Sequence, residues 1–390
     1  MNSSKLSLHY ASIQIFHWGA YAAIWGFIAL LLSSYGFRGT QIGVLTSTAT
    51  LLAVIVAPAV SALIDRSVGL SDRHGASALT ALALLLALIV HLSGIRARLP
   101  VAIAFVLIGA ALSSAPPFHN AMAMAAERRG FSINYGVCRG CGSVAYAIAA
   151  LGLGFLLDTH GAAILLPLFC VLDAALTLAS ISFRLPGRPG VDDASGTPPQ
   201  STPALLRANP RFVLTLLGCM FFIAGHVIPN TYVNSIVERV GGSPHAMGLV
   251  LAISAAAELP AMALVSRMRR KISCGLLLRI SAAAAMIKYL IFLFAPSIAA
   301  VYFAAALQFF QFGFYLPATV YYVAQTLAPG DQLKGQSLIH VAGSGLGAAI
   351  GGAAGGVLLD IGGIRLSLLF ALLCALAALV TFTLSTRNNR

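Results

Sequence analysis

The segment GFLLDTHG at residues 154–161 recurs as GVLLDIGG at residues 356–363, which is 202 residues further along a chain of 390. Both copies close a long apolar run with the same pair of residues, Asp158 with Gly161 and Asp360 with Gly363. The displacement is about half of the chain length. The repeat therefore predicts two halves that carry the same elements in the same order.

The composition excludes a water-soluble globule. Hydrophobic residues make up 59% of the chain and charged residues only 9%, whereas a soluble domain carries about 25% charged residues. Apolar runs of about 20 residues, the length that crosses a bilayer as a helix, recur along the whole chain. The runs are continuous rather than alternating, and in lipid only helices and closed barrels satisfy the backbone. We therefore expect an all-α membrane protein.

Twelve transmembrane helices are predicted from these runs, six before and six after a central break. Several contain Gly or Pro, which membrane helices tolerate where neighbouring helices satisfy the backbone. The predicted spans are about 12–34, 41–64, 76–94, 99–124, 136–157, 162–183, 211–236, 246–266, 273–294, 297–325, 336–359 and 363–384.

The break at residues 184–210 is the longest polar stretch of the chain and is rich in Pro and Gly. We predict that it is a cytoplasmic linker between an N-terminal six-helix half, residues 1–183, and a C-terminal six-helix half, residues 211–390. Parallel repeats of six helices are typical of one large transporter architecture, in which the substrate site lies between the halves near the bilayer midplane.

The basic residues indicate the orientation of the chain. The formal charge is +13, but Lys and Arg lie in short clusters between the apolar runs, which argues against nucleic-acid binding. If both termini are cytoplasmic, 16 of the 24 Lys and Arg residues fall inside, 5 outside and 3 within spans. This is the positive-inside distribution. We therefore expect a multi-pass protein of a bacterial-type inner (plasma) membrane with both termini in the cytoplasm.

The second predicted span resembles a signature of the major facilitator superfamily. GTQIG at residues 39–43 leads through Ala57-Pro58 to LIDR at residues 63–66. The resemblance implies that Asp65 and Arg66 are gating residues, which hold the two halves together in the outward-facing state. Ser61 stands where the superfamily usually has glycine.

A narrower resemblance is spread over the whole chain. The sequence is similar to the branch that holds the phenylpropionate permeases and the lactose permease group of oligosaccharide–proton symporters. The resemblance implies that Arg139 lies at a sugar- or anion-binding position, that Asn120 replaces a carboxylate and that Tyr146 replaces a stacking aromatic residue. The motifs that carry it are PPFHN at 116–120, YGVCRGCGS at 135–143, AELP at 257–260 and GQSL at 335–338.

The same resemblance implies how a proton is coupled to transport. Glu258 matches the coupling carboxylate of the lactose permease group, and Lys288 matches a basic partner. Gln308 and Gln311 stand where that group has a histidine and its proton-carrying glutamate. Because a glutamine cannot carry a proton, either Glu258 does so or the coupling differs.

The charged residues inside the spans support these roles independently. Each costs about 2.5–3.5 kcal/mol on insertion scales, so the few that occur are informative. Glu258 and Lys288 are interpreted as a proton-coupling pair, with a purely structural ion pair as the alternative. Arg139 can bind a carboxylate or vicinal hydroxyls through its planar fork, or serve as an interfacial positive charge. Asp173, deep in its span, lines the cavity or pairs with a polar neighbour.

Polar and aromatic side chains in further spans suit a solute cavity. Trp18, Tyr21 and Trp25 share one helix face, which fits an aromatic wall for a ring-bearing solute or ordinary packing. His226 and Asn230 in one span and the two glutamines in another fit a water-filled cavity lined with hydrogen-bonding groups. The predicted substrate-binding residues are Arg139, Asn120, Tyr146, Asn230, Gln308, Gln311 and Trp25.

Small residues are concentrated in two spans. Cys138 and Cys141 form an isolated C-x-x-C pair without a second pair or a histidine pair, so we expect helix packing there rather than a metal site. Glycines between residues 345 and 356 allow helices to approach closely, for sliding or for static packing. No metal and no cofactor is expected.

The leading functional hypothesis is a secondary active transporter, not an enzyme. We expect proton-coupled symport of a small organic solute by alternating access, with an aromatic or other carboxylate favoured. A sugar or nucleoside symporter and a proton-driven exporter of the same fold remain alternatives. An intramembrane enzyme is disfavoured because the sequence has no H-E-x-x-H, no paired aspartates and no Ser/His dyad at helical spacing. ATP-driven transport is unsupported because the sequence has no G-x-x-x-x-G-K-S/T loop. The expected partners are the solute, protons and the lipid bilayer, and the chain is expected to act as a monomer.

Overall fold

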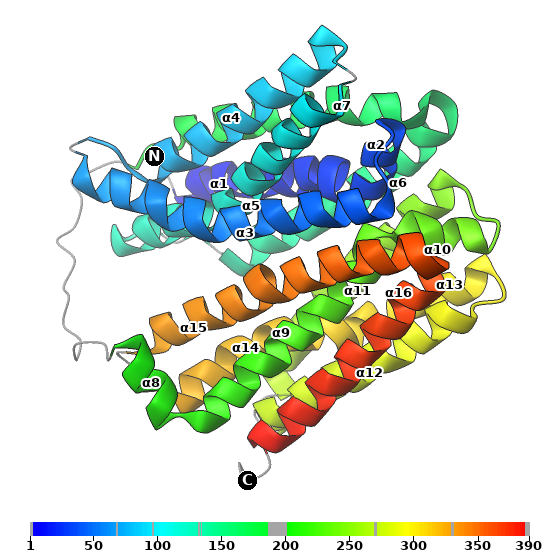
Figure 1. Cartoon of the computed structure of the whole chain (residues 1–390). Helices are drawn as coiled ribbons and strands as arrows, with labels where there is room; N and C mark the ends of the chain where they lie inside the picture. The colour runs from blue at the N-terminus through cyan, green and yellow to red at the C-terminus, as the bar shows by residue number, and fades with distance from the viewer. Residues whose placement is uncertain are drawn as a thin grey trace. The chain divides into compact units, whose positions relative to one another are not determined.

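The computed structural model describes residues 3–67, 69–95, 97–131, 133, 135–185, 201–268, 271–328 and 331–386. Within these ranges the regular elements are helices and no strand occurs (Figure 1). The predicted all-α class is confirmed. Its physical cause is the continuous apolar pattern, because a helix satisfies its own backbone groups in lipid.

The number of membrane-spanning helices is consistent with twelve. Among the described residues, nine helices are long and apolar enough to cross a membrane, and the bent pair Ser3–Gly26 with Ile28–Ser34 brings the number to ten. Two of them run over 48 and 53 residues, whereas about 20 residues span the hydrocarbon core. Each of these two contains a glycine with positive φ, Gly161 at +64° and Gly363 at +68°, at which the chain can turn.

Two compact units are found, and each is described by itself. The first comprises Met1–Phe37 and Thr48–Asp192. Its helices are α1 (Ser3–Tyr21), the π-helix η1 (Ala22–Gly26), α2 (Ile28–Ser34), most of α3 (Gly39–Arg66), α4 (Asp72–Ser93), α5 (Arg98–Arg128), α6 (Tyr135–His160), the 3₁₀ turn η2 (Gly161–Ile164) and α7 (Leu165–Ser182). Helix α4 packs against α5 and α7, and α1 packs against α6 and α7.

The second unit comprises Arg38–Ser47, the start of α3, and Asp193–Arg390. Its helices are α8 (Thr202–Ala208), α9 (Pro210–Thr231), α10 (Val233–Arg239), α11 (Pro244–Met268), α12 (Cys274–Phe294), α13 (Ile298–Ala306), α14 (Gln308–Thr326), α15 (Gln332–His340), the π-helix η4 (Val341–Gly347) and α16 (Ala348–Thr386). Helix α9 packs along α16, α12 packs against α14 and α16, and α11 packs against α14.

The predicted linker at residues 184–210 lies mostly outside the described residues, which lack 186–200. Its last part forms the short helix α8, with Pro203 in the first turn. Proline suits that position, because its missing N–H would have no helical partner there.

Four predicted spans are interrupted, and one of them, 336–359, passes through the π-helix η4. The first begins at Ser3 rather than at residue 12, passes through η1 and bends by 53°. The predicted span 211–236 is broken at Tyr232, three residues after Pro229, and the span 297–325 is broken at Leu307. Proline and π-turns are common causes of such breaks. The break at Leu307 makes Gln308 the first residue of α14.

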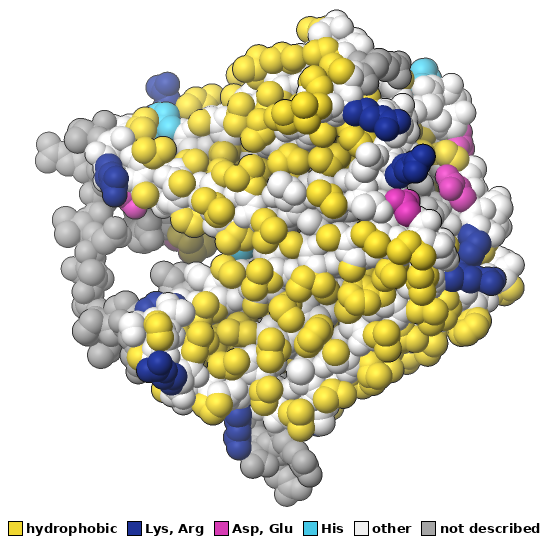
Figure 2. All heavy atoms as spheres, viewed as in Figure 1, with side chains coloured by type: hydrophobic (Ala, Val, Ile, Leu, Met, Phe, Trp, Pro, Cys, Tyr) yellow, Lys and Arg dark blue, Asp and Glu magenta, His cyan; other side chains and the backbone are white. Residues whose placement is uncertain are grey.

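The outer surface of the helices is apolar. Figure 2 shows hydrophobic side chains over the middle parts of the helices of each unit, with Lys and Arg mainly near helix ends. Large side chains such as Ile55, Phe155 and Phe294 are 67%, 61% and 74% exposed. Apolar patches of this extent are unusual on soluble proteins and match a lipid environment.

Candidate functional site

A buried chain of hydrogen bonds joins three helices of the second unit. The Nζ of Lys288 in α12 donates to Oε1 of Gln308 at 2.6 Å. The Nε2 of Gln308 in turn donates to Oε1 of Glu258 in α11 at 2.8 Å. The amide thus bridges the cation and the carboxylate. The structure brings together these three residues, each of which the sequence singled out.

Burial explains why the bridge is needed. Lys288 is 2% exposed and Gln308 is 3% exposed, whereas Glu258 is half-buried. The Nζ of Lys288 also lies 5.7 Å from the ring centroid of Phe292. Taking an ammonium group out of water costs several kcal/mol (roughly 3–5 when a partner is lost) unless it is paired and hydrogen-bonded. Gln308 is that hydrogen-bond partner, and its amide also donates to Glu258.

A second polar cluster lies one turn further along α14. The Nε2 of Gln311 donates to the hydroxyl of Tyr289 at 2.7 Å and lies 3.3 Å from Nδ1 of His226. The Nε2 of His226 lies 2.9 Å from Nδ2 of Asn230. In the described part of the chain, the buried Oε1 of Gln311 has no hydrogen-bond partner. This acceptor, beside an imidazole and an amide, suits a hydroxyl or amine of a solute.

Two residues of this cluster are absent from the predicted site. Tyr289 follows Lys288 directly, but the residues three and four positions before and after it are all apolar. His226 precedes Asn230 by four residues, which places both on one helix face. That spacing was the available signal for His226, whereas Tyr289 needed the packing of α12 against α14.

Arg139, in the first turns of α6, contacts an aromatic side chain of α1. Its guanidinium carbon lies 4.1 Å from the ring centroid of Trp18 in α1, and its Nη1 donates to Oγ of Ser143 at 3.1 Å. Gly142 makes room for the indole, because a Cβ there would overlap Trp18. A guanidinium over an indole gains about 0.5–2 kcal/mol. It keeps its planar fork of N–H donors, which can bind a carboxylate or a diol.

An aromatic row continues along the first helix. The ring centroids of Trp18 and Tyr21 are 5.4 Å apart, and those of Tyr21 and Trp25 are 6.1 Å apart. The predicted shared face is therefore confirmed, while its role as a wall for a solute stays a prediction. The buried Nε1 of Trp25 has no hydrogen-bond partner within the described ranges.

Asn120 lies in α5 beside the start of α6, and Tyr146 lies in the middle of α6. The exposed Asn120 accepts a hydrogen bond from the hydroxyl of Tyr135 at 3.0 Å, and Tyr135 is the first residue of α6. Tyr146 is half-buried and follows Arg139 by seven residues on the same helix. Two helical turns separate them, so both start from one face of α6.

The predicted gating residues lie at the C-terminal end of α3. The side chains of Asp65 and Arg66 are both exposed there. Neither residue is a member of the polar clusters described above. Their function stays a prediction.

Asp360 is a functional candidate that the sequence reasoning missed. Its Oδ1 accepts a hydrogen bond from the backbone N–H of Gly39 at 2.9 Å, and its Oδ2 accepts from that of Thr40 at 2.7 Å. The hydroxyl of Tyr232 donates to the carbonyl of Gly39 at 3.2 Å. A carboxylate at a helix N-terminus satisfies free N–H groups and complements the helix dipole. The repeat with Asp158 was the available signal for this residue.

The same end of α3 runs close to α16 within the second unit. A Cβ on Gly43 would overlap the carbonyl oxygen of Gly352, and a Cβ on Gly356 would overlap that of Gly39. The predicted close approach at these glycines is confirmed.

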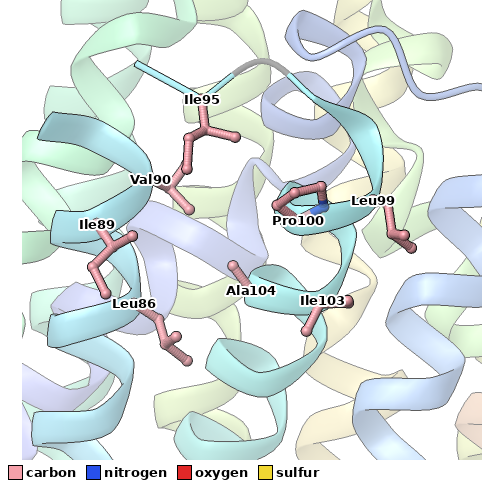
Figure 3. A pocket seen from close by; sticks show the side chains of 8 residues that line it. All are labelled: Leu86, Ile89, Val90, Ile95, Leu99, Pro100, Ile103 and Ala104. Atoms are coloured by element: carbon pink, nitrogen blue, oxygen red, sulfur yellow. The ribbon is translucent and has the colours of Figure 1, made fainter. Parts of the chain in front are cut away.

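An apolar hollow lies on the first unit, between α4 and α5 (Figure 3). Its lining offers a polar solute no hydrogen-bonding side chain, and it shares no residue with the polar clusters. We therefore do not regard it as the candidate site. The hollow is lined by Leu86, Ile89, Val90, Ile95, Leu99, Pro100, Ile103 and Ala104.

Comparison with known sequences gives one family. The profile of the MFS_1 like family matches residues 6–370. A maltose permease of Geobacillus stearothermophilus is 28% identical over 288 residues, which cover 73% of this chain and 71% of that protein. An uncharacterized transporter, YwbF, of Bacillus subtilis (strain 168) is 22% identical over 228 residues, which cover 58% of this chain and 56% of that protein.

Solved structures show the same fold. The nucleoside transporter NupG, as a mutant, superposes with a TM-score of 0.81 at 16% identity, over 99% of this chain and all of that one. A bacterial homolog of the human lysosomal transporter Spinster, inward-facing and unoccupied, gives a TM-score of 0.71 at 15% identity, over 99% of this chain and 97% of that one.

Proposed function

Because this chain belongs to the MFS_1 like family of the major facilitator superfamily, we propose that it is a proton-coupled symporter for a small organic solute. Family membership makes the protein a multi-pass membrane transporter rather than the intramembrane enzyme considered above. Proton coupling, the solute and the direction of transport belong to the proposal.

The hydrogen-bonded chain Glu258–Gln308–Lys288 carries the proposal. Glu258 is the carboxylate that takes up the proton. Protonation removes its charge and weakens the charge-assisted hydrogen bond from Gln308. Because the same amide holds Lys288, proton uptake on α11 alters the pairing of the cation on α12. A proton can thus bias the conformation of the second unit without direct contact with the solute.

The chemistry of the second cluster supports a neutral, hydroxyl-rich solute. Gln311, His226 and Asn230 are amide and imidazole groups, and Lys288 is already engaged by Gln308. Such groups recognise hydroxyls by directed hydrogen bonds. A relative named maltose permease and a structural neighbour named as a nucleoside transporter agree with a sugar or nucleoside.

An aromatic or other carboxylate is the second candidate. Arg139, stacked on Trp18, presents the fork that binds carboxylates in two-point contacts. The aromatic row with Trp25 suits a ring-bearing acid. Asn120 of α5 and Tyr146 of α6 complete this half of the proposed substrate site.

The proposed organisation follows the repeat and the charges. Residues 1–183 and 211–390 form six-helix halves joined by a cytoplasmic linker at 184–210. Both termini are cytoplasmic in a bacterial-type inner membrane, and the chain works as a monomer. Asp65 and Arg66 hold the halves together in the outward-facing state of the alternating-access cycle.

The test is uptake into proteoliposomes under an imposed pH gradient. Labelled sugars, nucleosides and aromatic acids are screened with and without a protonophore. Accumulation of one class that the protonophore removes supports symport and identifies the solute. Accumulation that does not respond to the protonophore contradicts proton coupling.

A matched pair of variants tests the role of Glu258. Glu258→Gln is expected to lose accumulation against a gradient while solute exchange across the membrane continues. Glu238→Gln changes an exposed glutamate of the same unit and is expected to accumulate like the wild type. Full accumulation by Glu258→Gln would rule out that residue as the proton carrier.

A further inference from the structure

A second buried acid lies in the first unit, in a setting unlike that of Glu258. Asp173, in the middle of α7, is 0% exposed. Both of its carboxylate oxygens lack a hydrogen-bond partner among the described residues. Glu258, by contrast, accepts a hydrogen bond from Gln308 and is half-buried. The protonation states of the two acids are therefore set by different surroundings.

The hydroxyl groups nearest to Asp173 along α7 are engaged elsewhere. Thr177, one turn on, donates to the hydroxyl of Thr80 in α4 at 2.8 Å. Ser180, a further turn on, lies 3.3 Å from Nε2 of His119 in α5. The helix thus carries a buried polar stripe whose other members are paired and whose acid is not.

The titratable groups around Asp173 are a cysteine, two histidines and a tyrosine, with no Lys or Arg among those that the described residues contribute. Cys170 is on α7 itself and is buried. Helix α1 is antiparallel to α7 with Gly19 against a residue next to Asp173, which puts His17 at the level of the acid. Tyr21 follows His17 by one turn, with ring centroids 6.2 Å apart, and His119 from α5 lies 5.2 Å from His17. The buried face of α4, with η1 and η2, contributes no titratable side chain in the described residues.

An ionised carboxylate cannot persist in this place at an acceptable cost. A charged group buried without a partner gives up its charge in practice, and within a bilayer the penalty is among the largest in proteins. A metal cation would need several oxygen ligands, and no cluster of three or more His, Cys, Asp or Glu side chains that could hold a metal exists among the described residues. A proton needs only the carboxyl group itself.

We propose that Asp173 is a second proton-binding site of this transporter, occupied in the conformation described. Release breaks its O–H bond and gives the proton to a water molecule, leaving the carboxylate. Water reaches the acid only when α7 parts from α1 or α4, because the side chain is fully covered by its neighbours. Loading and unloading of Asp173 are thereby tied to a conformational change in the first unit. This inference is independent of the role proposed for Glu258.

Infrared difference spectroscopy of the protein in lipid at neutral pH tests the proposal. Wild type minus Asp173→Asn is expected to show the C=O stretch of a protonated carboxylic acid. The spectra of two control variants should retain this band. They are Asp158→Asn, which changes an exposed aspartate of the same unit, and Glu258→Gln. In D₂O the band shifts as the acid proton is exchanged for deuterium, and the rate of this shift reports how often water reaches Asp173. A difference spectrum with carboxylate bands and no carboxylic-acid band would overturn the proposal.

A second variant keeps the test valid if one variant folds poorly. Asp173→Leu replaces an unpaired neutral acid by an apolar side chain of similar size, so it is expected to unfold at a temperature no lower than wild type. The same carboxylic-acid band should be missing from its spectrum. Marked destabilisation of both variants would indicate that Asp173 is ionised and paired, and would also overturn the proposal.

Discussion

Lys288 and Gln308 are joined by a hydrogen bond of 2.6 Å between Nζ and Oε1, buried where α12 packs against α14. The other end of the same amide donates to Glu258 at 2.8 Å. One oxygen accepts and one nitrogen donates, so both ends of this glutamine are used at once. A carboxylic side chain at position 308 could not keep both contacts in its ionised form, because it would have no donor for Glu258.

The first prediction concerns the bridge itself. Gln308→Leu is expected to lower the free energy of unfolding by about 1–3 kcal/mol, because it leaves the buried ammonium of Lys288 without its acceptor. Thermal unfolding in detergent measures the effect. The double variant Gln308→Leu with Lys288→Met is expected to recover part of the loss, since no buried cation remains. The single variant Lys288→Met is measured as well. A loss in the double variant equal to the sum of the two single losses would contradict a direct interaction.

The second prediction concerns two glycines of α6. Gly142→Ala is expected to destabilise by about 1–3 kcal/mol, because the added methyl group overlaps Trp18. Gly152→Ala meets no atom within 4 Å and is expected to be neutral or to stabilise by up to about 1 kcal/mol, since alanine favours a helix more than glycine. Equal effects of both variants on thermal unfolding would argue against the packing of Trp18 on α6.

The third prediction uses the small number of tryptophans. The chain has 2, Trp18 and Trp25, so Trp25→Phe leaves Trp18 as the only indole fluorophore. In that background, Arg139→Lys is expected to change the emission of Trp18, because the planar guanidinium over the ring is replaced by a compact ammonium. If Arg139 also binds the solute, addition of the transported compound shifts the emission before, but not after, the Arg139→Lys change. An unchanged spectrum in the variant would contradict the stacking.

The fourth prediction concerns the start of α3. Asp360→Asn is expected to speed hydrogen exchange at the amides of Gly39 and Thr40, because the neutral side chain loses the charge-assisted hydrogen bonds and the attraction to the helix dipole. The cost is about 0.3–1 kcal/mol, the usual contribution of a negative charge near a helix N-terminus, which corresponds to an increase of roughly two- to five-fold in exchange at these two amides. Asp158→Asn, at the equivalent position of the repeat, is expected to leave the exchange of these amides unchanged. Equal exchange in all three proteins would show that Asp360 does not hold this helix end.

The sequence predicted more of the fold than of the site. Helices followed from continuous apolar runs, because lipid leaves few other ways to satisfy the backbone. Glu258, Lys288 and Gln308 could be singled out because polar groups in a span are costly, but their order in space could not. Gln308 was predicted as a solute contact, which stays a prediction, and its place between the other two came from the structure. Sequence separations of 20 and 50 residues have no local signature.

Other parts of the sites depended on packing that the sequence does not encode locally. Tyr289 and His226 meet Gln311 because α9, α12 and α14 converge around it. Asp360 was visible as a repeated residue, but its partners are the first amides of a helix more than three hundred residues earlier. Breaks at Tyr232 and Leu307 were missed because the apolar pattern continues through them.

The sequence by itself determined that the chain is an all-helical membrane protein with an internal repeat, since hydrophobicity, helix length and glycine placement are local properties of the chain. Only the tertiary structure decided which polar side chains share a hydrogen bond and which are buried alone. Glu258 and Asp173 look alike in the sequence, as acids within apolar spans. Packing gives the first a glutamine and a lysine and leaves the second without a partner in the described residues, because the neighbours of a buried charge come from other helices.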